Sequence, residues 1–298
     1  MLKMSMLISI SFLLGLHFSR GFFASYEDEF NMHEPKKGQD KDNMHIAIGF
    51  GMTSISIGLV KNGEVISRTR IPVLSQTGLL RRLTLIVDVI YKLLSRSQVT
   101  LSECTGLGIA TSGVIDEERR TLITINDAYS DAIGFPFVEW FEGAFGLPCI
   151  LVNDNKAALA GEAAYGVARG ETNALLVTIE TGIAAAAMLN GHALPGWEFL
   201  NMDDLRVCEE TYINQPVGSQ CGDSLISHWM TYIVNLIQVY APNIVILSGG
   251  FISAQVDLVP LLQEQVSKYA GKPWGNARFV VVEDLDTSIL LGVSRLLE

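Results

Sequence analysis

Residues 147–165, LPCILVNDNKAALAGEAAY, decide the fold of this chain. The apolar residues 149–152 predict a buried strand, a polar turn follows, and the Ala-rich run up to residue 165 predicts a helix. Asp154 therefore lies at the carboxyl end of a strand, where open α/β sheets bind their ligands. Asp154, or Asn153 before it, is equally suited to cap the helix by accepting its free N–H groups. The turn thus has two open interpretations, a cap and a chemical site.

Length and composition limit the number of domains and the kinds of function that the chain can have. The chain has 298 residues, 49% of them apolar, which is enough for one large domain or two modest ones. Its net charge is −11, and because such a surface repels phosphate backbones we expect no nucleic-acid partner. The cysteines are widely spaced and predict neither a disulfide framework nor a zinc pair; they are Cys104, Cys149, Cys208 and Cys221.

The first 43 residues differ from the rest. The apolar run at residues 6–18 is too short for a membrane span and has about the length of a signal-peptide core. Residues 21–25, GFFAS, form a poor cleavage region, and residues 26–43 are charged and predict a disordered linker. A signal or anchor and a non-structural extension before Met44 both stay open. Membrane contact is expected only through this segment, and the location is otherwise expected to be cytoplasmic.

The remaining sequence predicts one α/β pattern that occurs twice. The Asn-Gly pairs at 62–63 and 190–191 are strong hairpin signals. The first half is predicted as strands at 45–60 (two runs), 64–72, 105–110 and 149–152 with helices at 78–96 and 136–145. The second half is predicted as strands at 174–179, 183–189, 243–247 and 278–282 with helices at 224–240, 259–269 and 288–297. Two α/β lobes create a cleft between them, a favoured ligand site.

Turns rich in Gly and Thr follow the first strand of each half. Such turns can present backbone N–H groups and a hydroxyl to phosphate. The Gly-Gly pair at 249–250 lets the backbone approach a flat ligand closely. Each turn alone is most often explained by backbone angles. Together with Asp154 they predict a nucleotide-dependent phosphotransferase, in which the carboxylate accepts the proton of the attacking hydroxyl.

Residues 46–298 resemble the ROK family of repressors, open reading frames and sugar kinases, in the actin and hexokinase superfamily. The resemblance is clearest in the blocks TGLGIATSGVID (105–116), FGLPCILVNDNKAALAGEAAYG (145–166), 174–191, VILSGG (245–250) and 289–293. It implies an α/β fold of two actin-like (ribonuclease H-like) lobes with a central cleft, at 44–152 and 153–298, after an extension at 1–43. It also implies ATP-dependent phosphorylation of a hexose or N-acetylhexosamine with ATP and Mg²⁺, and a homodimer is a further expectation.

The resemblance assigns residues to the sugar side of the site. Asp154 matches the catalytic base that activates the sugar hydroxyl, and Asn153 matches a sugar contact. Gly113 and Asn126 match the sugar-side loops, and Glu210 matches a sugar-binding Glu.

On the nucleotide side, Thr53 lies in the first phosphate hairpin, and Thr181 and Gly182 lie in the second. Gly249 and Gly250 match the adenosine-side turn.

The chain also departs from the family pattern. Gly49 and Met52 replace an Asp that helps to hold the metal and a Gly of the first hairpin, and Glu180 brings a negative charge to the second. Alanines replace three glycines at 184–186, and the zinc knuckle is reduced to Cys208, so we expect no structural zinc. These departures favour an alternative, a catalytically impaired pseudokinase that binds sugar or a protein partner. A repressor's effector domain is disfavoured by the acidic charge and the missing DNA-binding segment.

Overall fold

The computed structural model describes residues 43–51, 53–73, 78–125, 127–180, 183–194, 220–254, 256–272, 274–282 and 284–298. The signal-like run, the linker before Met44 and the segment around Cys208 lie outside the described residues.

A five-stranded sheet forms the first half of the described chain. Its strands are β1 (Met44–Phe50), β2 (Ser54–Lys61), β3 (Glu64–Pro72), β4 (Cys104–Thr111) and β7 (Cys149–Asn153), in the order β3-β2-β1-β4-β7. The β2–β3 hairpin is antiparallel, and its turn residues Asn62 and Gly63 have φ angles of 51° and 76°. This is the left-handed conformation that the Asn-Gly pair predicts. Strands β4 and β7 run parallel to β1, so their carboxyl ends lie at one edge.

The second sheet repeats this topology. Its strands are β8 (Ala174–Ile179), β9 (Ile183–Leu189), β10 (His192–Ala193), β11 (Ile244–Ser248) and β12 (Arg278–Val281), in the order β10-β9-β8-β11-β12. Strands β8 and β9 are antiparallel, whereas β11 and β12 run parallel to β8. The α/β fold and its duplicated pattern are thus confirmed. A small third sheet pairs β5 (Val114–Asp116) with β6 (Thr121–Thr124).

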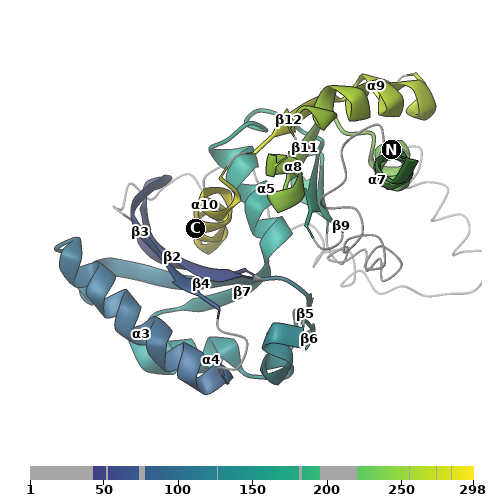
Figure 1. Cartoon of the computed structure of the whole chain (residues 1–298). Coiled ribbons are helices and arrows are strands. Elements are labelled where there is room, and N and C mark those ends of the chain that lie inside the picture. Colours follow the sequence, from purple (N-terminus) through teal and green to yellow (C-terminus); the bar gives the residue numbers. More distant parts are fainter. Residues whose placement is uncertain are drawn as a thin grey trace, which may run out of the picture. The chain divides into compact units, whose positions relative to one another are not determined.

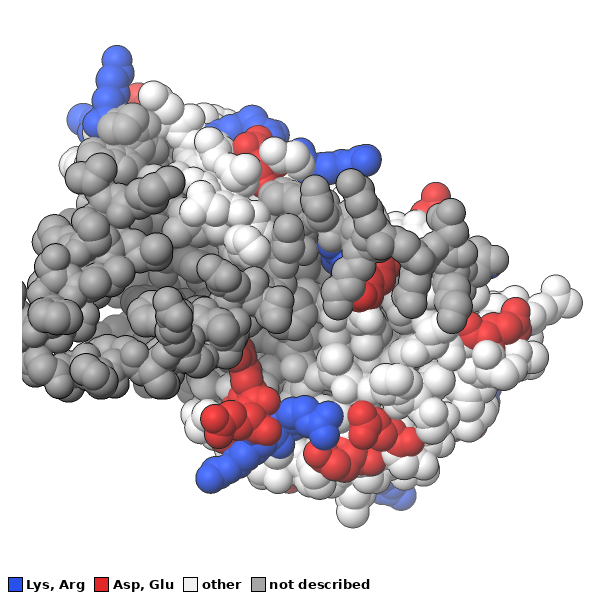
Figure 2. All heavy atoms as spheres, turned by 180° about the vertical axis from the view of Figure 1, so that it is seen from behind, with Lys and Arg blue, Asp and Glu red and all other residues white. Residues whose placement is uncertain are grey.

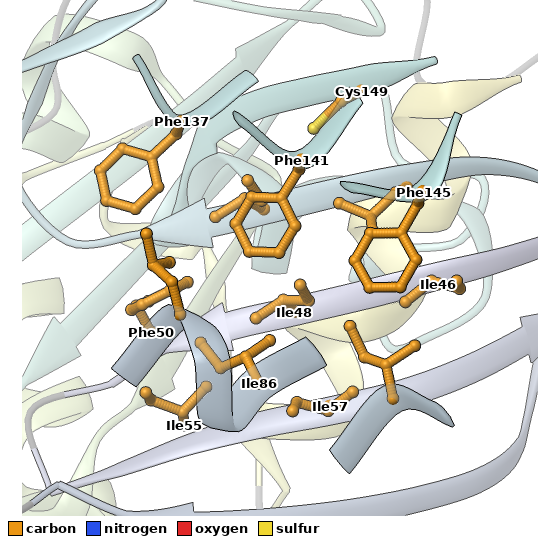
Figure 3. Packing of buried hydrophobic residues seen from close by; sticks show 14 of the residues in the cluster. Ile46, Ile48, Phe50, Ile55, Ile57, Ile86, Phe137, Phe141, Phe145 and Cys149 are labelled. Carbon is orange, nitrogen blue, oxygen red and sulfur yellow. The ribbon is translucent and has the colours of Figure 1, made fainter. Parts of the chain in front are cut away.

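Two helices and the first sheet share a hydrophobic core. These are α3 (Leu79–Arg96) and α4 (Phe137–Phe145), whose apolar residues recur at helical spacing. Figure 3 shows Phe137, Phe141 and Phe145 of α4 side by side, facing the isoleucines of the sheet. Phe141 and Phe145 are stacked, with ring centroids 6.2 Å apart. This packing gives the strands that end at the candidate site a rigid support.

Helices α5 (Asp154–Ala164) and α10 (Leu285–Leu297) pack closely against each other. Helix α10 follows the last strand of the second sheet yet contacts β1, β2, β3 and β4 of the first, while α5 contacts β8 and β9 of the second (Figure 1). A Cβ atom on Gly161 of α5 would overlap the carbonyl oxygen of Ser288 in α10. Glycine at this position therefore permits the close approach of the two helices.

The other described helices belong mainly to the second half. Helices α7 (Gln220–Tyr240) and α9 (Leu258–Ala270) contact each other, and α7 also contacts β8 and β9. The short helix α8 (Gly250–Ala254) begins in the Gly-Gly turn, and short 3-10 helices occur at Leu101–Glu103, Asp127–Ala132 and Trp274–Asn276. Helix α10 begins three residues before the predicted start at 288, because the side chain of Asp284 accepts the Thr287 N–H and caps it.

Charged side chains of both signs lie near one another on the face shown in Figure 2. Within the described ranges, Arg120 pairs with Glu139 at 3.2 Å and Lys156 pairs with Glu117 at 3.0 Å. None of the helices in these ranges is both long and apolar enough to cross a membrane.

Candidate functional site

The predicted site residues that the structure describes lie at or after the ends of strands. Gly113 follows β4 and Asp154 follows β7 in the first half, and Gly249 follows β11 in the second. Parallel strands present their carboxyl ends at one sheet edge, where α/β folds place ligands. Asn126, Thr181, Gly182 and Glu210 lie outside the described residues, so their roles stay predictions.

Asn153 holds the turn between β7 and α5. Its side chain is 1% exposed, and its Oδ1 accepts the backbone N–H groups of Asn155 at 2.9 Å and Lys156 at 3.2 Å. Its Nδ2 donates to the Gly113 carbonyl oxygen at 3.1 Å. Asn153 is therefore the helix cap and ties the end of β7 to the turn after β4. Its direct contact with a sugar stays a prediction.

Gly113 is required by the backbone of that turn. Its φ angle is +107°, and a Cβ atom here would overlap the carbonyl oxygen of Thr124 in β6. A larger residue would push the β5–β6 hairpin away from the end of β4 and disturb the Asn153 bond. The structure thus brings Gly113 and Asn153 together, and the contact of either residue with a sugar stays a prediction.

Asp154 is the first residue of α5 and is partly buried. Its Oδ1 accepts the backbone N–H of Asn155 at 2.8 Å and the Asn155 side-chain Nδ2 at 2.9 Å. Both bonds leave Oδ2 clear of Asn155. Burial raises the pKa of this carboxyl to about 7, and the negative charge of Glu180 adds to the effect, while the bonds from Asn155 oppose it. A carboxyl with this pKa can accept a proton near neutral pH.

Glu180 follows β8 and reaches the Gly-Gly turn. The Gly250 backbone N–H donates to the Glu180 carboxylate, which lowers its pKa, but burial of the carboxyl group and the negative charge of Asp286 raise the pKa above its ordinary value. The residue itself keeps much of its surface exposed. The negative charge of Asp286 therefore acts on Glu180, and the negative charge of Glu180 acts on Asp154. Among the described residues, no group of three or more His, Cys, Asp or Glu has an arrangement that could hold a metal ion.

Gly49, which the resemblance places where a metal-holding Asp is expected, lies in β1. A Cβ atom on Gly49 would lie 2.8 Å from the Ser56 hydroxyl oxygen and 3.3 Å from the Ile289 Cγ2 atom. A side chain at this position must therefore displace these neighbours, and glycine itself supplies no charge for a metal ion.

The turn between β1 and β2 is held by hydrogen bonds within the turn and from other parts of the chain. The Gly51 N–H donates to the Ser54 carbonyl oxygen at 3.0 Å, and the hydroxyl of Tyr129 donates to the Gly51 carbonyl oxygen at 2.8 Å. Thr53 is exposed, and its carbonyl oxygen accepts the Val73 N–H at 2.9 Å. The Gly51 N–H is thus engaged within the chain. Phosphate binding by Thr53 stays a prediction.

Gly249 and Gly250 differ in their surroundings. Gly249 has a φ angle of +100°, and a Cβ atom on it would overlap the carbonyl oxygen of Ile179 at the end of β8. A Cβ atom on Gly250 would meet no atom of the described residues within 4 Å. The turn therefore packs on β8 through Gly249 and leaves open space at Gly250, as a ligand-facing backbone requires.

Sequence reasoning missed a group of buried polar side chains behind Asp154, namely Asn155, Thr178 and Ser248. Thr178 and Ser248 lie near or at the ends of strands β8 and β11. Hydroxyl side chains at the ends of otherwise apolar strands are the signal that could have drawn attention to them.

Known proteins resemble this chain in sequence and in structure. The ROK family model matches residues 45–199, more than half of the 298 residues. A glucokinase of Halalkalibacterium halodurans is 30% identical over 157 residues, which cover 52% of this chain and 47% of that protein. The chain thus spans about half the length of the curated relatives it matches.

Solved structures share the fold, among them two ROK kinases. The ROK hexokinase of Thermus thermophilus has a TM-score of 0.67 at 21% identity, covering 85% of this chain and 97% of that one. The ROK glucokinase of Streptomyces griseus, solved in complex with glucose and AMPPNP, has a TM-score of 0.66 at 17% identity, covering 85% and 99%. This chain therefore belongs to the ROK family and has the actin-like α/β fold of the family's sugar kinases.

Proposed function

We propose that this chain binds a hexose or an N-acetylhexosamine and that Asp154 is the general base for its ATP-dependent phosphorylation. One observation carries the proposal: Asp154 follows the carboxyl end of β7, where Asn155 holds its Oδ1 and burial raises its pKa to about 7. General bases work best when their pKa lies near the working pH. The glucokinase relative and the glucokinase solved with glucose and AMPPNP support the same substrate class.

The chemistry requires little of the protein beyond position and charge. In the proposed step, Oδ2 of Asp154 takes the proton of the sugar hydroxyl. The sugar oxygen then forms a bond to the γ-phosphorus of ATP, while the bond from that phosphorus to the β–γ bridging oxygen breaks and ADP leaves. Mg²⁺ supplied with ATP neutralises phosphate charge. Asn153 and Asn155 hold the base in place through the hydrogen bonds described above.

The nucleotide side fits this step less well than the sugar side. The open space at Gly250 suits a ligand, but its N–H already binds the Glu180 carboxylate. A phosphate at this position must displace Glu180 and then faces its negative charge. Gly49 supplies no carboxylate to the metal. We therefore expect weak binding of Mg·ATP and slow phosphoryl transfer.

These features favour a second candidate function. In it the chain is a pseudokinase that binds sugar, or a protein partner, without phosphoryl transfer. The specific observation is the contact of Glu180 with the Gly250 N–H, because a carboxylate here takes the place of an anionic ligand. A sugar-binding pseudokinase shares the sugar site with the kinase and differs from it only in turnover.

Calorimetry and a coupled assay for ADP distinguish them. The purified full chain is titrated with glucose, N-acetylglucosamine and N-acetylmannosamine, with and without Mg·ATP, and ADP release is followed. Sugar-dependent ADP release that is lost in Asp154→Asn and kept in Asp88→Asn, an exposed Asp of α3, supports the kinase. Sugar binding without ADP release supports the pseudokinase. Absence of binding to every sugar overturns the sugar site itself.

A further inference from the structure

A series of buried polar side chains links Asp154 to the end of β11. Asn155 Nδ2 donates to Asp154 Oδ1 at 2.9 Å, and the Thr178 hydroxyl donates to Asn155 Oδ1 at 2.6 Å. The hydroxyl oxygens of Thr178 and Ser248 are 2.7 Å apart. Asn155 is 6%, Thr178 9% and Ser248 0% exposed. Residues from α5, β8 and β11 thus form one hydrogen-bonded series.

The direction of these bonds follows from the donors that each group has. A threonine hydroxyl has one proton, and the Asn155 carbonyl oxygen is an acceptor only. The Thr178 proton therefore goes to Asn155, and Thr178 must accept the proton of Ser248. Every bond in the series then points its donor toward the Asp154 carboxyl. Hydrogen bonds aligned in this way polarise one another and favour negative charge at the accepting end.

Burial of the polar side chains of Asn155, Thr178 and Ser248 is unfavourable for the stability of the fold. Burial of a hydroxyl or an amide is unfavourable unless it is hydrogen-bonded, and the neighbouring strand positions hold apolar side chains such as Val177 and Leu247. Valine in place of Thr178 would fill nearly the same volume without the polar group. Packing alone therefore does not account for the series.

We propose that Thr178 is a positioning residue for Asp154. Through Asn155 it holds Oδ1 in place, leaves Oδ2 to the substrate hydroxyl and stabilises the charged carboxylate. Ser248 completes the series and connects it to the turn at Gly249 and Gly250. The role in catalysis rests on the function proposed above, whereas the effect on the carboxyl group is measurable without any substrate.

The charges and hydrogen bonds around Asp154 determine how its pKa changes when the series is lost. Burial raises the pKa of Asp154 most, the negative charge of Glu180 after β8 raises it further, and the charge of Asp286 in α10 acts on Glu180. Lys156 of α5 has its ammonium nitrogen 3.0 Å from Glu117. The side-chain bond from Asn155 lowers the pKa of Asp154 against burial. Loss of the series must therefore raise this pKa further and leave less carboxylate at neutral pH.

The test is a titration of the Asp154 carboxyl by NMR on ¹³C-aspartate-labelled full chain, with the signal assigned by its loss in Asp154→Asn. We expect the midpoint to rise by about one pH unit in Thr178→Val and to stay unchanged in Thr178→Ser, which keeps the hydroxyl. Thr105→Val is the matched control, because Thr105 lies in strand β4 and bonds the Met44 carbonyl oxygen at 3.3 Å. Its midpoint should equal that of the wild type.

An unchanged midpoint in a folded Thr178→Val protein overturns the proposal, whether or not the chain phosphorylates sugars. If Thr178→Val does not fold, Ser248→Ala removes the outermost donor and must raise the midpoint in the same direction by a smaller amount. In a chain with turnover, the pH of half-maximal rate must shift with the carboxyl midpoint. A titration that shifts as expected in a chain without turnover supports the positioning role and overturns only the kinase function.

Discussion

Gly292 of α10 lies so close to Ala157 of α5 that a Cβ atom on Gly292 would overlap the Ala157 carbonyl oxygen. Ala157 is three residues after Asp154, and α10 contacts the strands of the first sheet. The position of the proposed base therefore depends on how closely these two helices approach.

We expect Gly292→Ala to destabilise the chain, because the added methyl group must separate α5 from α10. Overpacking of this kind costs about 1–3 kcal/mol, measured as the free energy of unfolding in urea. Gly143→Ala in α4 is the matched control, since a Cβ atom there meets no atom within 4 Å. It should leave the stability unchanged or increase it by about 0.5–1 kcal/mol. Equal stability of both variants would contradict the close crossing.

Removal of the charge at Glu180 should strengthen Mg·ATP binding. In Glu180→Gln and Glu180→Gly the repulsion between carboxylate and phosphates disappears, and we expect a dissociation constant roughly threefold to tenfold lower by calorimetry at pH 8. Glu264→Gln, at an exposed position of α9, controls for the change in net charge. If the affinity does not change, the obstacle to phosphate binding lies elsewhere, in the alanines of β9 or at Gly49.

Any phosphorylation rate should follow the ionisation of Asp154. The carboxyl must be charged to accept a proton, and its pKa of about 7 places the half-maximal rate near that pH. The rate should therefore rise between roughly pH 6 and pH 8 and then level off. A steady-state pH profile of kcat/KM, with saturating Mg·ATP, checks this. A rate that is constant over that range would argue against Asp154 as the base.

Because of the buried His45, the free energy of unfolding should fall in acid. It is 3% exposed, its Nδ1 lies 2.8 Å from the Ser294 hydroxyl, and burial lowers its pKa from 6.5 to about 4. The folded chain then binds fewer protons at His45 than the unfolded chain does. The contribution of the neutral His45 to the free energy of unfolding is complete above about pH 6.5. Up to about 3 kcal/mol of it is lost as the pH falls toward 4.

Urea unfolding of His45→Gln at pH 7 and pH 5 tests this effect. Glutamine does not titrate, so the loss of stability between these two pH values should be smaller in the variant than in the wild type. His192→Gln changes an exposed histidine and should keep the wild-type dependence. The assignment to His45 fails if both variants behave alike.

Much of the secondary structure was predictable because it depends on residues that are close together in the sequence. Strands β8 and β9 have the predicted bounds, since both are short apolar runs closed by turn residues. The Asn-Gly pairs formed the predicted hairpins, and Phe137, Phe141 and Phe145 lie on one helix face as their spacing requires. The start of α10 was misplaced, because the cap at Asp284 lies outside the apolar pattern.

The candidate site was predictable only in part. Asp154 at a strand end follows from local pattern, but the pattern did not decide which of two polar residues caps the helix. The structure assigns the cap to Asn153, because its buried side chain faces the free N–H groups of Asn155 and Lys156. The lobe boundary at residues 152 and 153 and the homodimer stay predictions.

Local sequence was sufficient for the strands, the hairpins and the position of Asp154, because periodicity and turn chemistry act over a few residues. Tertiary structure alone decided what surrounds that carboxyl. The bond from Thr178 to Asn155 spans 23 residues and the one between Thr178 and Ser248 spans 70. Such contacts arise only when separate strands pair in register. Burial, the bonds from Asn155 and the charge of Glu180 set the pKa on which the proposed chemistry of Asp154 depends, and Thr178 bonds that Asn155.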